Sequence, residues 1–250
     1  MQNIHDFEER VHAARKEIAA ILAGERPVSS GSYIQHAAYI AARSQKNHPA
    51  AQGSQPLNRK ERTHYNQQVK PAEETSLKQW AKENGLWVEA IPFNKQYSNN
   101  FLDEGAEQKV YLNQSGKTVV KINTGIYHGT WLEFLIRLIL HLAIFPSTEY
   151  RLTGFSMQAN QFSAILEQPF VDIKAGASND EIENFLSGIG FINLRNYDYY
   201  SAEDGILLED LHDENVFKDE QGVLYFIDPV IYLETPDLGL DGRSQFHFPF

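Results

Sequence analysis

The sequence predicts an α+β fold in which antiparallel hairpins are combined with helices. Two hairpin turns, Ser115-Gly116 and Ala159-Asn160, stand between short apolar runs typical of strands. An apolar helix is expected over residues 131–145, ended by Pro146. The order of strands and helices has no regular βαβ repeat, and neither GxGxxG nor GxxxxGK[ST] occurs. A doubly wound nucleotide-binding fold is therefore disfavoured.

The composition is that of a protein with a sizeable core. The chain has 250 residues, 42% of them hydrophobic, with 15 Phe and 12 Tyr. It has no cysteine, which excludes disulfides and thiolate sites and agrees with a reducing compartment. The most apolar stretch, 134–145, carries Arg137 and His141 and is too short to span a bilayer, and the first residues lack the apolar run of a signal peptide. We expect a cytoplasmic protein with no membrane partner.

The charge is unevenly distributed. The net charge is -11, but residues 43–70 hold six Lys and Arg against one acidic residue. An acidic body repels phosphates and argues against broad contact with nucleic acid. The basic segment has two interpretations, a weak nucleic-acid contact or a solvated linker, and the linker is preferred.

Patterning divides the chain into four parts. They are an N-terminal helical segment (1–43), a polar basic linker (44–75), a sheet region (76–170) and a C-terminal region (171–250). Helices are predicted over 6–23, 32–43, 76–85, 131–145 and 179–188, the last with a capping box at Ser178 and Glu181. Strands are predicted over 86–91, 108–113, 117–122, 149–156, 161–167 and 223–227.

The most informative stretch is LEDLHDENVFKDEQGVLYFIDP, residues 208–229. It places Asp210, Asn215 and Asp228 at intervals of five and thirteen. A turn over 218–222 would fold the strand 223–227 back, so that Asn215 and Asp228 meet at one end of a hairpin. Carboxylate and amide oxygens suit Mg²⁺, and a carboxylate nearby can take a proton from a hydroxyl. The competing interpretation treats the three side chains as turn residues.

This stretch resembles the catalytic and metal-binding loops of the protein-kinase-like superfamily. The form D-L-H-x-x-N-V followed by I-D is most similar to aminoglycoside and choline kinase-type phosphotransferases. The resemblance implies that Asp210 is the catalytic aspartate and that Asn215 and Asp228 bind Mg²⁺ with ATP. It also implies a minimal bilobal protein-kinase-like fold, with an antiparallel N-lobe sheet, a reduced C-lobe and the N-terminal helical extension.

Upstream, V-V-K at 119–121 is similar to the kinase strand whose lysine contacts ATP phosphates, so the resemblance assigns that role to Lys121; a surface lysine is the alternative. The preceding G-x-E-Q-x-V-Y has one glycine where kinases have three. This form resembles the kinase domain of polyvalent proteins from phages and conjugative elements, over about residues 77–235. By that resemblance Gly105, Gln108 and Val110 contact the nucleotide.

Two further assignments follow from the resemblance. Glu133 would pair with Lys121, although Thr130-Trp131-Leu132-Glu133 is also a capping box, which leaves both roles open. Residues 165–171 take the position of the kinase hinge, where the Glu167 carbonyl and the Phe170 N–H would bind adenine, because Pro169 has no N–H.

The C-terminal region is short for a kinase, with 22 residues after Asp228. We expect the helices 6–23 and 32–43 to pack on residues 175–250 and add buried area. His212, two residues after Asp210, either supports the loop or is an ordinary polar loop residue.

The preferred hypothesis is a phosphotransferase that uses ATP and Mg²⁺ and acts on a hydroxyl of an unknown protein or small molecule. A second is a pseudokinase-type module that binds nucleotide without turnover. A third transfers an adenylyl group, which the mass of the product would distinguish. A fourth is a structural protein, which would not respond to Mg-ATP.

Overall fold

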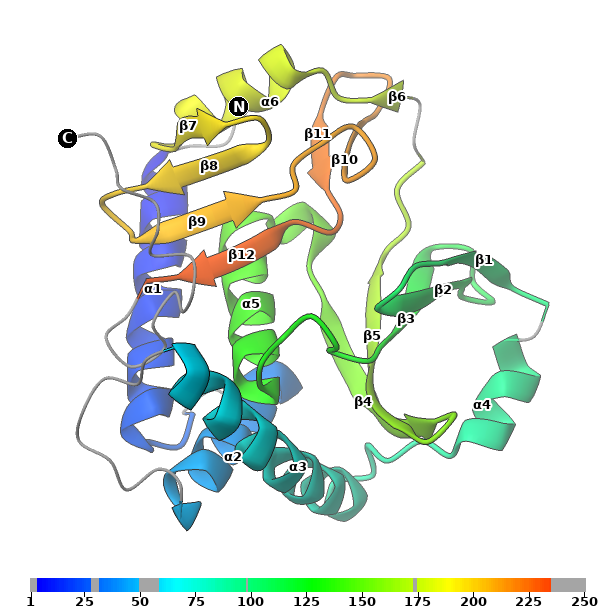
Figure 1. Cartoon of the computed structure of the whole chain (residues 1–250). Helices are drawn as coiled ribbons and strands as arrows, with labels where there is room; N and C mark the ends of the chain where they lie inside the picture. The colour runs from blue at the N-terminus through cyan, green and yellow to red at the C-terminus, as the bar shows by residue number, and fades with distance from the viewer. Residues whose placement is uncertain (1–3, 28–31, 50–58, 98, 173–174, 235–250) are drawn as a thin grey trace. The chain divides into compact units, whose positions relative to one another are not determined.

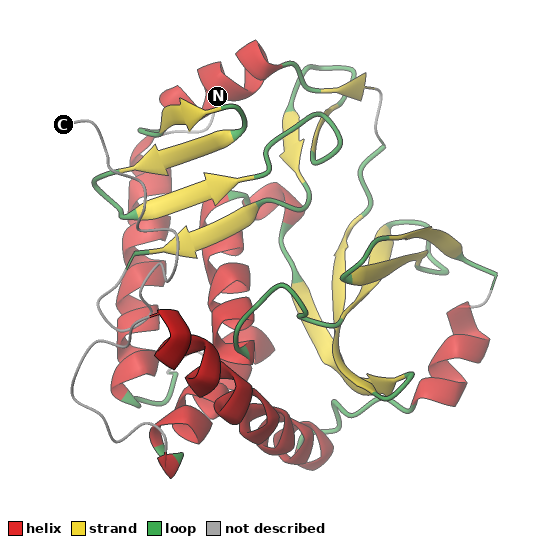
Figure 2. Cartoon of the chain, in the orientation of Figure 1, coloured by secondary structure: helices red, strands yellow, loops and turns green. Residues whose placement is uncertain are grey.

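A computed structural model describes residues 4–27, 32–49, 59–97, 99–172 and 175–234. The chain divides into two compact units (Figure 1). Unit 1 comprises residues 1–16, 140–148 and 171–250, and unit 2 comprises residues 17–139 and 149–170. Figure 2 shows helices and strands in each unit, and the strand pairings named below are antiparallel, so the predicted α+β class is confirmed.

Unit 2 contains a five-stranded sheet in the order β1-β2-β3-β5-β4. Its strands are β1 (Phe101–Glu104), β2 (Gln108–Leu112), β3 (Thr118–Asn123), β4 (Arg151–Gln158) and β5 (Gln161–Pro169). The predicted turns are confirmed: Gly116 has φ +69°, and Ala159 and Asn160 have φ 46° and 66°. Positive φ at both central residues suits a two-residue hairpin, because it matches the twist of the strands.

Helices pack on both faces of this sheet. On one face, the ring of Trp131 in α5 (Trp131–Ile144) contacts Phe155 and Phe162, with centroids at 6.2 and 5.0 Å. On the other, α4 (Ala90–Tyr97) places Phe93 and Tyr97 on the apolar side chains of β3 and β5. Residues 86–91, predicted as a strand, contribute one isolated bridge at Trp87 before α4 begins. That prediction was wrong.

The helices α2 (Tyr33–Lys46) and α3 (Arg59–Glu83) pack against each other in unit 2. The buried face of α2 consists of Ile34 and four alanines, whose small side chains allow a close approach. Polar contacts add to it: Gln45 donates to Glu73 at 2.8 Å and Ser76 to Ser44 at 3.2 Å. The predicted linker over 44–75 is therefore helical from Arg59 onward, while residues 50–58 lie outside the described residues.

Unit 1 contains two small sheets. A four-stranded sheet in the order β12-β9-β8-β7 comprises β7 (Ile192–Arg195), β8 (Asp198–Ser201), β9 (Ile206–Glu209) and β12 (Val230–Leu233). A three-stranded sheet in the order β11-β10-β6 comprises β6 (Ala175–Gly176), β10 (Val216–Lys218) and β11 (Leu224–Phe226). Among these strands the sequence predicted the hairpin of β10 and β11, with the partner strand beginning near Val216.

Helices flank these sheets within unit 1. The helix α6 (Asn179–Ser187) has the predicted capping box, and a short 3-10 helix, η2, covers Pro146–Thr148. The first part of α1 (Ile4–Ala23) packs here: Phe7 meets the ring of Phe191 at 6.2 Å, and Arg15 donates to the Glu203 carbonyl at 3.3 Å. The predicted packing of the first helix on this region is thus confirmed, whereas α2 packs on α3. Among the described helices, none is long and apolar enough to cross a membrane.

Candidate active site

The loop after β9 in unit 1 carries Asp210, an exposed residue with φ +66°. Positive φ is uncommon outside glycine, and Asp tolerates it better than most residues. The side chain of Asn215 fixes this turn, because its Nδ2 donates to the Asp210 carbonyl at 2.9 Å and to Oδ2 at 3.1 Å. The five-residue spacing therefore places the amide directly beside the carboxylate.

His212 also supports this loop. Its Nδ1 accepts from the backbone N–H of Glu214 at 3.2 Å, which leaves the proton of the neutral ring on Nε2. Nε2 lies 3.2 Å from Oδ1 of Asp210, which places the ring edge against the carboxylate. The ring also meets Tyr197 edge-on at 5.8 Å. Of the two roles predicted for His212, the loop-supporting one matches this geometry.

The hairpin β10–β11 brings Asp228 to the same end as Asn215. Val216 pairs with Phe226, and the N–H of Ile227 donates to the Asn215 carbonyl at 2.9 Å. The amide nitrogen of Asn215 is directed at Asp210, so its Oδ1 is the atom that can accept a cation. The sequence prediction of a shared hairpin end is confirmed for the backbone.

The strand leading to Asp228 is firmly anchored in unit 1. The ring of Phe226 stacks on Phe145 at 4.2 Å and lies 5.1 Å from Phe185. Thr148 is fully buried and donates from Oγ1 to the Phe226 carbonyl at 2.6 Å. Sequence reasoning missed Thr148 and Phe145, because nothing local to either residue signals a contact with a strand almost 80 residues later.

In unit 2, Lys121 is a buried cation in the middle of β3, with 2% of its surface exposed. Its Nζ donates to the hydroxyl of Tyr150 at 3.4 Å and lies 5.3 Å from the centre of that ring. The alternative of a surface lysine is therefore wrong. A buried ammonium needs compensation, and the Tyr150 ring face and hydroxyl supply part of it.

Glu133 forms the capping box that its sequence predicts. Its Oε2 accepts from the N–H groups of Gly129 at 2.9 Å and Thr130 at 3.3 Å, while its own N–H donates to Thr130 Oγ1 at 3.1 Å. Burial raises the pKa of Glu133, and the two backbone hydrogen bonds act in the opposite direction. The capping role is thus confirmed, and the ion pair with Lys121 stays a prediction.

A second carboxylate reaches the start of α5 from helix α3. Glu73 is fully buried, and its two oxygens accept from the N–H groups of Trp131 at 2.8 Å and Leu132 at 3.1 Å. Burial raises the pKa of Glu73 to about 7, against the opposing effect of Gln45 and the two N–H donors. Together with Glu133, it satisfies the backbone donors of the first turn of α5.

The turn between β1 and β2 is the part that resembles a shortened glycine-rich loop. The Gly105 N–H donates to the Gln108 carbonyl at 2.9 Å and closes the turn. A cavity of about 500 Å³ is lined by Gly105, Gln108 and Ile122, among others. Successive residues of a strand face opposite sides, so Ile122 and Lys121 point away from each other, whereas Val110 pairs with Lys121 and shares its face. By the same alternation Gln108, which pairs with Asn123, lies on the face of Val110 and Lys121.

The predicted hinge residues lie at the end of β5. Glu167 is partly buried; burial opposes its ionisation, but hydrogen bonds from Thr118, Arg151 and Asn113 lower its pKa. The Phe170 N–H donates to the Lys117 carbonyl at 2.9 Å. That donor is thus used within the sheet, and adenine would have to displace this bond to be recognised by Phe170.

Among the described residues, no cluster of three or more His, Asp and Glu side chains is arranged to hold a metal. Mg²⁺ in phosphotransferases takes one or two carboxylates together with substrate phosphates and water, and Asn215 and Asp228 can be compared with that donor set. Both side chains offer the hard oxygen atoms that Mg²⁺ prefers, so the donor set fits the ion.

Residues 70–235 match a family model described as a serine/threonine/tyrosine kinase found in polyvalent proteins. The match covers more than half of the chain, and the chain belongs to this family of kinases. The matched residues include Lys121, Asp210, Asn215 and Asp228. The comparison with curated proteins finds no match. The resemblance of the loop at Asp210 to aminoglycoside phosphotransferases remains a prediction.

Proposed function

We propose that this protein is a phosphotransferase that uses ATP and Mg²⁺ and transfers phosphate to a hydroxyl group of a protein or a small molecule. The observation that carries the proposal is the gathering of Asp210, Asn215 and Asp228 around one end of the β10–β11 hairpin. Membership in a kinase family supports the reaction class.

Asp210 is the proposed catalytic residue. In the transfer, the bond between the γ-phosphorus and its bridging oxygen breaks, and a bond to the acceptor oxygen forms. The acceptor hydroxyl loses its proton to the Asp210 carboxylate, and ADP leaves. The hydrogen bond from Asn215 and the contact with His212 at 3.2 Å orient this carboxylate, and its exposure leaves it accessible to an acceptor.

Asn215 and Asp228 are the residues proposed to hold Mg²⁺. When bound there, the ion would neutralise charge on the ATP phosphates. The anchoring of Phe226 by Thr148 and the aromatic stack limits the movement of the backbone that leads to Asp228.

The nucleotide contacts are proposed in unit 2. Lys121 would contact the α and β phosphates, with Gly105, Gln108 and Val110 around it and the backbones of Glu167 and Phe170 at adenine. Burial keeps Lys121 in one position and removes competing water, which strengthens its attraction to phosphate. Glu133 enters in its capping role, and an ion pair with Lys121 is the alternative.

Thermal unfolding with Mg-ATP tests nucleotide and metal binding together. Ligand at a hundredfold excess over its dissociation constant stabilises by about 2.7 kcal/mol. For a chain of this length the expected rise in Tm is roughly 5 to 11 °C. We expect this rise to need Mg²⁺ and to disappear in Asp228→Ala, with Asp219→Ala in the adjacent hairpin turn as the control. No rise in the wild type would contradict the proposal.

Phosphate transfer tests the role of Asp210. We expect Asp210→Asn to lose transfer by roughly 10² to 10⁴-fold, the usual contribution of a general base, while it retains the Mg-ATP stabilisation. Nucleotide binding without transfer to any acceptor in the wild type would indicate a pseudokinase. A product heavier by an adenylyl group would indicate that the protein transfers an adenylyl group instead of phosphate.

A further inference from the structure

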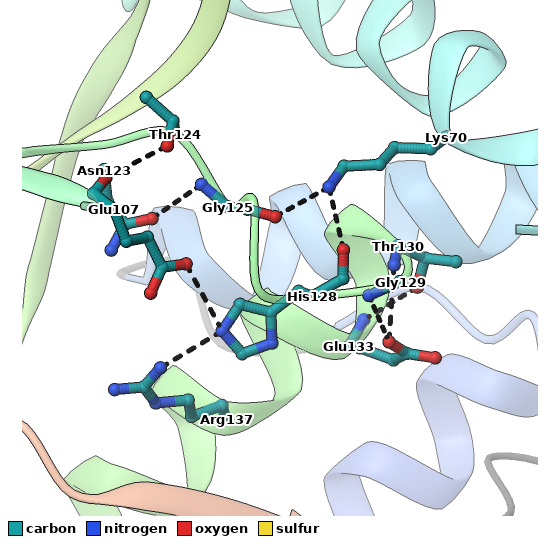
Figure 3. Close-up of polar contacts among 10 residues, drawn as sticks. All are labelled: Lys70, Glu107, Asn123, Thr124, Gly125, His128, Gly129, Thr130, Glu133 and Arg137. Carbon is teal, nitrogen blue, oxygen red and sulfur yellow. Dashed lines mark hydrogen bonds and ion pairs between the residues drawn. The ribbon is translucent and has the colours of Figure 1, made fainter. Parts of the chain in front are cut away.

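The β1–β2 turn is hydrogen-bonded to the segment that follows β3. The carbonyl of Glu107, within this turn, accepts from the N–H of Thr124 at 2.9 Å and from its Oγ1 at 3.0 Å (Figure 3). The turn is thus attached to the chain just beyond the end of β3, three residues after Lys121. Its position depends on where residues 124–130 lie.

Residues 124–130 are in turn fixed by helix α3. The Nζ of Lys70 donates to the carbonyls of Gly125 at 2.6 Å and His128 at 2.8 Å (Figure 3). Gly125 adopts φ +61°, and a Cβ there would lie 3.2 Å from the ring of Trp131, so the segment has little room to move. Lys70 also lies 5.8 Å from the centre of the Trp131 ring.

The side chain of Glu107 lies against the same segment. Its Oε1 is 3.7 Å from Nε2 of His128, and Arg137 NH1 approaches that same nitrogen at 3.1 Å. Because Arg137 has only donors, Nε2 is the acceptor and the ring is neutral. Burial, followed by the charges of Arg137 and Lys70, places the pKa of His128 well below its usual value. The contact of Glu107 with His128 is therefore no ion pair, and nearby positive charge comes from Arg137 and Lys70.

We propose that Lys70 is a positioning residue for the β1–β2 turn, acting through the hydrogen-bonded segment 124–130. This inference rests on the proposed function, in which that turn covers the nucleotide. A turn with one glycine has fewer backbone conformations than one with three, so it keeps the position that its contacts with residues 124–130 give it. Helix α3 holds those residues through Lys70, while Glu73 on the next turn of the same helix fixes the start of α5.

Three variants of helix α3 test the proposal in the full-length protein. Lys70→Met keeps the length of the side chain and removes both carbonyl contacts, whereas Lys70→Arg retains donors. Lys78→Met is the matched control, because Lys78 also lies over a tryptophan ring, Trp87 at 5.1 Å. Hydrogen exchange without nucleotide reports the turn through the amides of Thr124 and Gly105, whose acceptors are Glu107 and Gln108. Titration with Mg-ATP reports the dissociation constant.

We expect Lys70→Met to speed exchange at both amides and to weaken Mg-ATP binding about tenfold, which corresponds to 1.4 kcal/mol. In Lys70→Arg, the exchange rates and the affinity for Mg-ATP should be close to those of the wild type. Lys78→Met should change neither the exchange rates nor the affinity. Unchanged exchange, or faster exchange with an unchanged dissociation constant, would overturn the inference. A wild type that binds no nucleotide would instead remove the proposed function.

A milder variant covers the case in which Lys70→Met fails to fold. Thr124→Val removes the hydroxyl that donates to the Glu107 carbonyl and keeps the backbone N–H bond. We expect exchange to increase in the turn and the dissociation constant for Mg-ATP to rise about threefold, in the range of one neutral hydrogen bond. No change in either quantity would count against the proposed attachment of the turn.

Discussion

Two helices of this protein begin with the same capping motif in opposite surroundings. In α5, Thr130 and Glu133 form the box, with Thr130 2% exposed. In α6, Ser178 and Glu181 form it, with 40% of the Glu181 side chain exposed. Burial raises the pKa of Glu133, whereas hydrogen bonds from Lys218 and Ser178 lower the pKa of Glu181 to about 2.

The difference shows that the surroundings, and not the motif, determine how a capping carboxylate titrates. At an exposed helix start the carboxylate keeps its hydration and gains donors, so its charged form is favoured. At a buried start the loss of hydration outweighs the same donors. The effect of burial applies to a second group at the start of α5, because Glu73 adds a fully buried carboxylate to the same turn.

The largest effect that would test this comparison is the pH dependence caused by Glu73. A carboxyl pKa raised from 4.5 to about 7 corresponds to roughly 3 kcal/mol between its protonation states. The raised pKa stabilises the fold below pH 4.5, and this stabilisation is lost as pH rises through about 7. Glu73→Gln resembles the protonated form at all pH values.

We therefore expect Glu73→Gln to match the wild type near pH 4.5 and to exceed its stability by roughly 3 kcal/mol at pH 8. Chemical denaturation at a series of pH values measures this difference. Glu83→Gln, an exposed position on the same helix, is the control. A difference that does not change with pH would show that the pKa of Glu73 is the same in the folded and unfolded states, and the contrast between the two helix starts would fail.

Removing the cap residue itself is expected to have a smaller effect. Ser, Thr, Asn or Asp to Ala at a cap costs about 0.5 to 2 kcal/mol. We expect Thr130→Ala to lose stability near the upper limit, because the N–H of Glu133 then loses its acceptor in a partly buried position. For Ser178→Ala we expect a loss near the lower limit, because water can replace the serine hydroxyl as the acceptor. Thermal unfolding of the two variants side by side measures both, and equal losses would contradict the role assigned to burial.

A third variant separates the two roles of Glu133. Glutamine also forms capping boxes, so Glu133→Gln keeps the cap and removes the charge. We expect less than about 0.5 kcal/mol of destabilisation and no more than a threefold change in the dissociation constant for Mg-ATP. A tenfold or larger loss of affinity at unchanged stability would instead establish the ion pair with Lys121.

Both capping boxes were visible in the sequence, because Thr130-x-x-Glu133 and Ser178-x-x-Glu181 are local patterns. The order Asp210, Asn215, Asp228 was equally readable, since a hairpin turn brings its own flanks together. Glu73 was not, because its partners on α5 lie 58 and 59 residues away in the chain. The start of α3 was missed because its first turns are polar on nearly every side, and its helicity depends on contacts with α2.

The remaining errors have similar causes. The run LWVEAI (86–91) has the composition of a strand, but Phe93 and Tyr97, four residues apart, are needed to cover one face of the sheet, and the chain turns helical at Ala90. The strands β7, β8, β9 and β12 have four residues each, too few for an alternating pattern to be distinguished. Short strands of this kind are stabilised by their neighbours rather than by their own sequence.

The smallest expected effect concerns the exposed helix start. Lys218 donates to both oxygens of Glu181, at 2.8 and 2.9 Å, and is the largest cause of its low pKa. In Lys218→Met we expect the pKa of Glu181 to rise towards 4.5 while the cap keeps it below that value, as followed by NMR titration of the carboxyl carbon. The rise should shrink in 1 M salt, because exposed charges are screened there. If the pKa of Glu181 stays near 2 in this variant, the Ser178 cap would be the cause of the low value. The exposed and the buried capping boxes would then differ through burial alone.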